Sequence, residues 1–153
     1  MQTRQPTKSP RSVRKTFPLL TKRVAEAPSP ADGKRILVMR FWPRGVTRSA
    51  ADLWLRELGT SPELIQKWKH GSIRWTEFRR AYLRELKDPA ARQAIAEIRK
   101  MLLQGPVTLL CSCPEEARCH RGILKQVILQ QTTASQPAPR RKKLIPSQKP
   151  LGL

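Results

Sequence analysis

An apolar run, a short polar loop and a second apolar-periodic segment follow one another near the carboxyl end of this chain. The run covers residues 107–110 and the periodic segment residues 123–129, which predicts a strand, a tight loop and a helix. In open α/β sheets, the loop that follows a strand lies at the carboxyl edge of the sheet, where ligands bind. The chain must therefore fold around a strand that brings this loop to such an edge.

Strands and helices alternate along the rest of the sequence. Apolar and β-branched runs predict strands at residues 20–25, 35–41 and 107–111. Helical periodicity predicts helices at residues 49–58, after the N-cap Ser61, at 74–87, from Asp88 to Gly105, and at 120–130. We therefore predict an α/β fold, a small three-layer-like domain with a short, mostly parallel sheet flanked by helices.

Composition divides the 153 residues into one domain and two tails. We expect the domain at residues 18–131. We expect disordered basic tails at residues 1–17 and 132–153, which combine Lys and Arg with Pro, Ser and Gln and have few apolar residues. The net charge of +20 favours polyanions at low salt, so the candidate partners are anionic small molecules and nucleic acids. The oligomeric state stays open.

The sequence also bears on location. No apolar stretch reaches the roughly 20 residues that span a bilayer, and the amino terminus has no apolar segment of a secretory signal. Three cysteines within nine positions make a poor disulfide framework and indicate a reducing compartment. We therefore expect a cytoplasmic protein that does not bind membranes.

The loop after the third predicted strand holds all three cysteines, Cys111, Cys113 and Cys119, and one of the two histidines, His120. One interpretation is thiol chemistry. Cys119 would be a nucleophile or redox thiol at the first turn of a helix, where the backbone amides and the helix dipole stabilise a thiolate. His120 would be its base and Arg121 an electrostatic stabiliser. Whether the protein is an enzyme stays open, and the sequence points to no cofactor.

Three other interpretations of the same loop stay open. Cys111, Cys113, Cys119 and His120 have the right count for tetrahedral zinc, although a Cys-x-Cys pair converges only if the strand has already ended. Cys113 and Arg118 have the Cys-x4-Arg spacing of phosphate or sulfur-transfer loops, but this loop contains two glutamates and no glycine. The cysteines can also be purely structural, because free Cys is often a core residue.

A second group of polar residues, Arg40, Trp42 and Arg44, follows the second predicted strand. Arg44 stands before a glycine and could present its guanidinium to a carboxylate or phosphate. Trp42 could stack on a ring, or it could pack in the core of a rigid turn. If the second and third predicted strands are neighbours, both loops share one edge, and Arg44 comes near Cys119 and Arg121.

Three blocks carry a resemblance to a known family. Trp42-Pro43-Arg44-Gly45, the Trp75-x2-Phe78-Arg79-Arg80-x-Tyr82 block and Cys119-His120-Arg121 are similar to motifs of the YeaO-like family, domain of unknown function 488, over about residues 20–130. The resemblance implies a small bacterial or archaeal cytoplasmic α/β domain and carries no activity with it. Met39 stands where the family usually has Asp, which implies an altered function if that Asp orients an arginine or takes part in catalysis.

Together these patterns predict a pocket for an anionic ligand, either phosphorylated or derived from nucleic acid. Its ligand-binding residues would be Arg40, Trp42, Arg44 and Arg118, and its catalytic residues would be Cys119, His120 and Arg121. The alternatives are a non-catalytic nucleic-acid-associated protein that uses its basic tails, and a Cys3His metal-binding domain.

Overall fold

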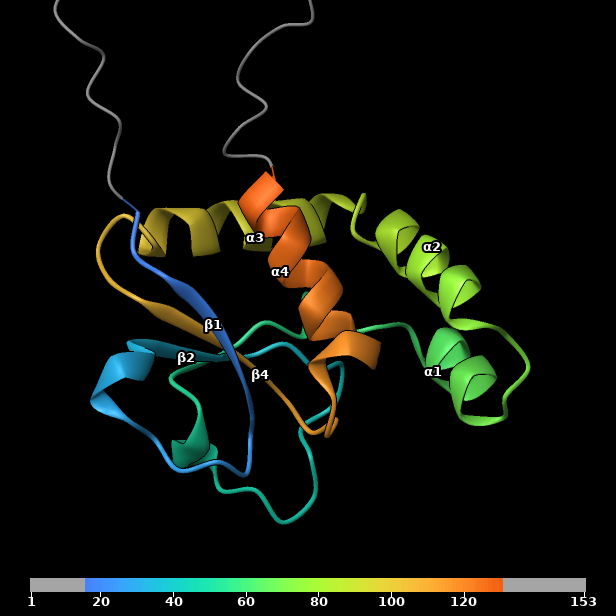
Figure 1. Ribbon diagram of the computed structural model, residues 1–153, viewed down its shortest axis with the longest axis horizontal. Helices are drawn as coiled ribbons and strands as arrows, with labels where there is room; N and C mark the ends of the chain where they lie inside the picture. Colours follow the sequence, from blue (N-terminus) through green and yellow to red (C-terminus); the bar gives the residue numbers. More distant parts are fainter. Residues whose placement is uncertain (1–15, 131–153) are drawn as a thin grey trace, which may run out of the picture.

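The computed structural model describes residues 16–130, so the predicted tails lie almost wholly outside the described residues. Four strands form one sheet in the order β1-β4-β2-β3, and every neighbouring pair is parallel. The strands are β1 (Leu19–Arg23), β2 (Lys34–Leu37), β3 (Leu53–Trp54) and β4 (Val107–Cys111). The predicted α/β fold with a short parallel sheet is confirmed (Figure 1).

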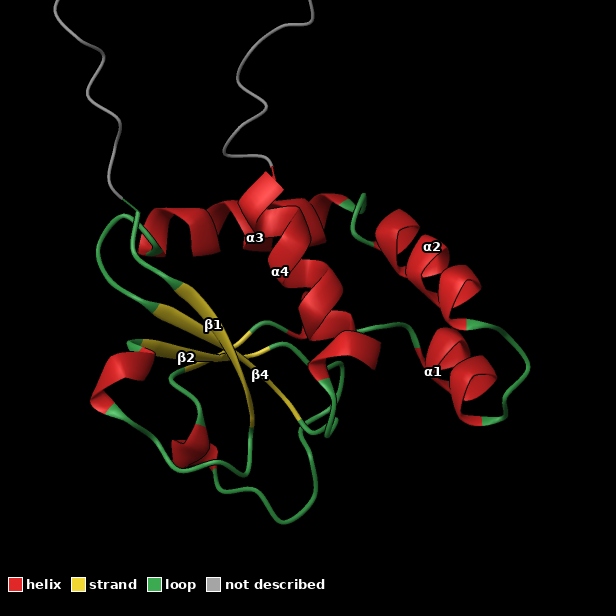
Figure 2. Cartoon of the chain, viewed as in Figure 1, coloured by secondary structure: helices red, strands yellow, loops and turns green. Residues whose placement is uncertain are grey.

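Four α-helices lie on one side of this sheet and beside it (Figure 2). They are α1 (Pro62–Lys69), α2 (Trp75–Glu85), α3 (Pro89–Met101) and α4 (His120–Gln130). Each contributes buried side chains to one core, which also contains Ile36 of β2 and Leu109 of β4. None of the described helices has the length and apolar character needed to cross a membrane.

The helix starts follow from local capping. The Ser61 hydroxyl accepts a hydrogen bond from the Leu64 amide at 3.3 Å, and Pro62 occupies the first turn of α1, where no amide hydrogen is needed. Asp88 caps α3 in the same way, with Pro89 after it. The predicted N-cap at Ser61 is confirmed.

The opposite face of the sheet is covered by the chain between β2 and β3. Leu37 and Leu110 point to this side and pack against a second apolar cluster that includes Trp42 and Trp54. The β2–β3 connection therefore replaces a helix as the cover of this face.

The predicted helix at residues 49–58 is wrong. The segment forms two short 3-10 turns, Arg48–Ala50 and Arg56–Leu58, with β3 between them. The amide of Asp52 donates to the Arg35 carbonyl at 2.8 Å and that of Leu55 to the Leu37 carbonyl at 2.9 Å. Sheet pairing therefore outweighs the local helical pattern. The predicted strand at 35–41 is also shorter and ends at Leu37.

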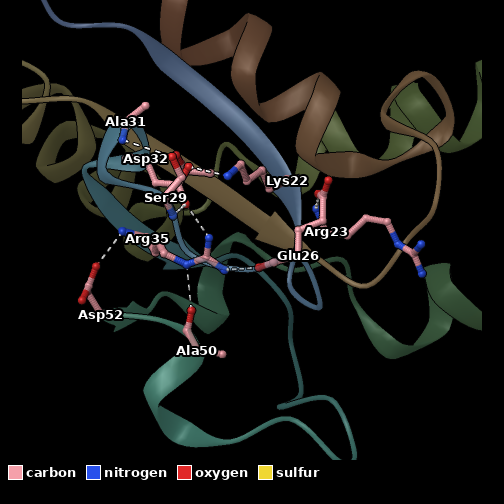
Figure 3. Close-up of polar contacts among 10 residues, drawn as sticks. Lys22, Arg23, Glu26, Ser29, Ala31, Asp32, Arg35, Ala50 and Asp52 are labelled. Atoms are coloured by element: carbon pink, nitrogen blue, oxygen red, sulfur yellow. Dashed lines mark hydrogen bonds and ion pairs between the residues drawn. The ribbon is translucent and has the colours of Figure 1, made fainter.

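A buried ion-pair cluster fastens the β1–β2 connection to the sheet (Figure 3). Asp32, only 1% exposed, lies 2.6 Å from both Lys22 Nζ and Arg35 Nη1. Arg35 also donates to the carbonyls of Glu26 and Ala50. Burial opposes ionisation of Asp32, but hydrogen bonds from Lys22, the Ser29 amide and Arg35 outweigh it and lower the pKa of Asp32 to about 2. Because both carboxylate oxygens are paired, we assign this cluster a structural role.

Candidate functional site

The strands β2 and β4 are hydrogen-bonded neighbours, so the loops that follow them share one edge of the sheet as expected. A cavity of about 400 Å³ opens at this edge, between the two loops and α1. Its wall from the cysteine loop consists of Cys111, Ser112, Cys113, Arg118, Cys119 and His120. The wall after β2 runs from Met39 to Pro43.

The three cysteines and His120 converge at the end of β4. The Sγ atoms of Cys111 and Cys113 lie 3.7 Å apart, and His120 Nδ1 lies 3.7 Å from Cys119 Sγ and 4.0 Å from Cys111 Sγ. The ligand atoms of Cys111, Cys119 and His120 all lie within 4.8 Å of one another. The Cys111–Cys113 pair converges because β4 ends at Cys111 and the chain bends at Ser112. The condition that the strand must end before a Cys-x-Cys pair can converge is thereby met.

The orientation of the His120 ring is set by two contacts on its far side. Nε2 lies 2.6 Å from the Val38 carbonyl oxygen, which can only accept, so Nε2 carries the proton and donates. The Tyr82 ring and the imidazole form a T-shaped pair with an interplanar angle of 84°, and the Tyr82 hydroxyl donates to the Leu58 carbonyl. Burial lowers the pKa of His120. A neutral imidazole therefore turns the Nδ1 lone pair toward the sulfur atoms.

Arg121 supports the loop from behind the cavity. It is only 3% exposed, and its Nη1 donates to the Cys113 carbonyl at 2.7 Å and to Cys119 Sγ at 3.7 Å. No other described residue accepts a hydrogen bond from its Nε. The guanidinium places a buried positive charge against the cysteine loop.

The ionisation of each cysteine therefore depends on its neighbours in the cluster. The neighbouring thiols of Cys113 and Cys119 lower the pKa of Cys111, with burial opposing and Arg121 assisting this shift. The pKa of Cys119 is raised, because the sulfur atoms of Cys111 and Cys113 compete for the charge and burial adds to the effect. Without a cation, the cluster favours one thiolate and disfavours a second.

The cavity wall is cationic and aromatic. Arg40, Lys69 and Arg118 line it, and no carboxylate does. Arg40 is held by hydrogen bonds to the carbonyls of Gly59 and Thr60, whereas no described residue pairs with the side chains of Lys69 and Arg118. The aromatic rings on the wall are those of Phe41, Trp42, Trp68 and Phe78.

The structure brings together most of the predicted site residues. Arg40, Trp42, Arg118, Cys119 and His120 line the cavity. Trp42 also packs edge-to-face on Trp54 and donates to the Val46 carbonyl, so it is both a wall and a core residue.

Two predicted wall residues do not line the cavity. Arg44 is exposed on the β2–β3 connection, and Arg121 lies behind the cysteine loop. Sequence reasoning missed Lys69 and the exposed Phe41. The sequence signal for Lys69 is its position directly after Trp68, an inner-face residue at the end of a short helix.

Three sulfur atoms and one imidazole nitrogen form a donor set that suits a thiophilic divalent cation such as Zn²⁺. Zn–S bonds of about 2.3 Å and Zn–N bonds of about 2.0–2.1 Å place tetrahedral ligand atoms roughly 3.5–3.8 Å apart. The separations of 3.7 Å between Cys111 and Cys113 and between Cys119 and His120 match this spacing, whereas the 4.0 Å between Cys111 and His120 is slightly longer. Cys113 is not part of the group of ligand atoms that lie within 4.8 Å of one another, so its side chain would have to move closer to complete the set. The Val38 carbonyl provides the outer hydrogen bond that metal-bound histidines usually make.

Fold and site together define a small parallel α/β domain with a Cys/His cluster at the carboxyl edge of its sheet. The chain belongs to the DUF488 family: residues 19–132 match the family model DUF488-N3a, described as the active DUF488-N3 subclade.

Relatives agree with this assignment. The chain is 35% identical over 108 residues to an uncharacterized protein of Mycobacterium tuberculosis, which covers 69% of this chain and 89% of the relative. It is also 35% identical over 106 residues to the uncharacterized protein YeaO of Escherichia coli, covering 67% of this chain and 90% of YeaO. The resemblance to the YeaO-like family is confirmed. No solved structure matches the chain.

Proposed function

We propose that this protein is a metal-stabilised domain that binds an anionic ligand. Cys111, Cys113, Cys119 and His120 hold one Zn²⁺ or similar cation, which ties the end of β4 to the start of α4. The observation that carries this proposal is the convergence of the Cys111 and Cys119 sulfur atoms on the Nδ1 atom of His120, whose Nε2 is fixed by Val38, with the Cys113 sulfur 3.7 Å from that of Cys111. The bound cation forms one wall of the cavity and keeps the loop in place.

Electrostatics support the metal. Three buried or half-buried thiols beside Arg121 disfavour more than one negative charge, so full deprotonation needs a compensating cation. A divalent cation supplies it, because thiols are deprotonated when they coordinate a metal. A site with four protein ligands is the closed type, whose role is to stabilise the fold.

The anionic ligand is supported by the composition of the cavity. Three cationic side chains line it with no carboxylate. Arg118 and Lys69 have no ion-pair partner among residues 16–130, so their charges are available to a ligand. Two unpaired cations at a concave surface favour an anion such as a phosphate group.

Thiol-dependent catalysis is the second candidate. It is favoured by the buried guanidinium of Arg121, which donates to the Cys119 sulfur and helps to lower the pKa of Cys111, and by the description of the matching subclade as active. Cys119 is only 2% exposed, although it lines the cavity. The metal distinguishes the candidates, because a coordinated thiolate is not a free nucleophile.

Cobalt substitution tests the metal proposal. Co²⁺ added to reduced, chelator-treated full-length protein should give thiolate-to-cobalt charge-transfer absorption and tetrahedral d–d bands that saturate at one equivalent. Cys113→Ser should weaken the charge-transfer band, and His120→Gln should shift the d–d bands. The control His70→Gln, at an exposed histidine outside the cavity, should leave both unchanged.

A folded protein that gives no cobalt bands would overturn the metal site. Rapid alkylation of Cys119 in that metal-free protein, slowed in Arg121→Gln, would then favour thiol chemistry.

A further inference from the structure

Phe41 is the most exposed large apolar side chain among the described residues, at 58%. It does not belong to either apolar cluster of the core. Instead it stands on the wall of the cavity, between Arg40 and Trp42. A single exposed phenyl ring is ordinary on a protein surface, but this ring lines a cavity, where an aromatic side chain can contact a ligand.

Phe41 has a free ring, whereas its neighbour Trp42 does not. The guanidinium of Arg48 lies 4.4 Å from the centre of the Trp42 ring, and Trp54 packs against it edge-on. No ring contact or cation–π contact to another described residue involves Phe41. Phe41 is therefore the ring of the β2–β3 connection whose face is free to stack on a ligand.

Cationic groups lie on the same cavity as this free ring. Arg118 comes from the cysteine loop, Arg40 precedes Phe41, and Lys69 ends α1. Two other cavities among residues 16–130 differ in this respect. One, between α2, α3 and α4, is lined by Lys87, Arg92 and Arg99 but by no aromatic ring. The other contains Trp75, but Glu116 lies on its wall and pairs with Lys125.

We propose that the anionic ligand is a nucleotide, with its base stacked on Phe41 and its phosphate bound by Arg118 and Lys69. This inference rests on the anion-binding part of the proposed function and does not require the cation to contact the ligand. Stacking accepts any base, because every base has a π face, and cationic side chains bind its phosphate. The same chemistry comes from a free mononucleotide or from one unit of a single strand. A volume of about 400 Å³ suits one such unit.

The test uses the full chain as purified, with any metal that it holds, and four probes in isothermal titration without added divalent cations: inorganic phosphate, adenosine, adenosine monophosphate, and a single-stranded oligonucleotide of about ten nucleotides. We expect adenosine monophosphate to bind at least tenfold more tightly than phosphate or adenosine. Phe41→Ala should weaken its binding roughly tenfold and leave phosphate binding unchanged. Arg118→Ala should weaken binding of both phosphate and nucleotide.

Two matched controls separate the cavity from general charge. Phe17→Ala removes another exposed phenyl ring, and Arg84→Ala removes another exposed guanidinium, both away from the cavity. Neither should change nucleotide binding.

The titrations distinguish failure of the nucleotide proposal from failure of the anion site itself. Equal affinities for phosphate and adenosine monophosphate, both reduced by Arg118→Ala and unaffected by Phe41→Ala, would overturn the nucleotide and keep the anion site. No effect of Arg118→Ala on any probe would overturn both. Much tighter binding of the oligonucleotide than of the mononucleotide, with the same dependence on Phe41, would identify a strand as the source, and equal binding per site would identify the free nucleotide.

Discussion

At the scale of single residues, Asp32 is a buried carboxylate that pairs with two cationic side chains. Its pairs with Lys22 and Arg35 join β1, β2 and the connection between them (Figure 3). The pKa of Asp32 in the folded protein, about 2, lies below its ordinary value of 3.8. The unfolded chain therefore binds a proton first, so this stabilisation is present above pH 3.8 and is lost as the pH falls toward 2.

We predict that Asp32→Asn lowers the free energy of unfolding at neutral pH by about 3 kcal/mol, because it leaves Arg35 buried without its charge partner. Urea denaturation at neutral pH and near pH 3 checks this prediction. The mutant should lose less stability than the wild type between the two pH values. Asp52→Asn is the control, since Asp52 is exposed and accepts only from the Arg35 amide. Equal losses in both mutants would contradict a special role for Asp32.

Gly59 packs closely against the backbone of Met39 and Arg40. A Cβ atom at this position would lie 2.1 Å from the Arg40 amide nitrogen, which cannot move as a side chain would. We predict that Gly59→Ala destabilises the fold by about 2 kcal/mol or more. Gly105→Ala should be nearly neutral, because a Cβ atom there has no neighbour within 4 Å. Thermal unfolding of the two mutants compares them, and similar melting temperatures would refute the close packing at Gly59.

At the scale of secondary-structure elements, the proposed metal site would join β4, the cysteine loop and α4. The loop between Cys111 and His120 has only one short 3-10 turn, Glu116–Arg118, to order it. A cation held by residues on both sides of the loop restricts it far more than its own hydrogen bonds do.

Removal of the metal should therefore loosen this segment first. We predict that a chelator raises amide hydrogen exchange in residues 112–121 and leaves α3, which contributes no ligand, unchanged. Mass spectrometry of peptic fragments from full-length protein, with and without the chelator, measures this difference. A uniform increase over all elements, or no increase at all, would contradict the localised role.

The elements also show what the sequence could predict. Ser61-Pro62 and Asp88-Pro89 mark helix starts through their own chemistry, so these boundaries follow from local sequence. At β3, the neighbouring Leu53 and Trp54 pack on opposite faces of the sheet. Such alternation over two residues is too short to distinguish from helical spacing, and only pairing with β2 decides it. The position of Arg44 and the free ring of Phe41 likewise depend on tertiary packing.

At the scale of the whole molecule, the net charge of +20 favours the binding of polyanions without regard to their base sequence. We predict that the full chain binds duplex DNA with an affinity that falls by about tenfold or more between about 50 and 200 mM salt. Phe41→Ala should not change this dependence, because duplex bases are not free to stack. Fluorescence anisotropy with a labelled duplex checks both statements, and a salt-independent affinity would contradict them.

Metal content per chain tests the central claim most directly. Full-length untagged protein, purified under reducing conditions without chelators, should contain about one zinc or similar ion per chain by elemental analysis. Cys119→Ser should lose that ion, and His70→Gln should retain it. Folded wild-type protein without metal that also takes up none on addition of Zn²⁺ would contradict the proposed Cys3His site.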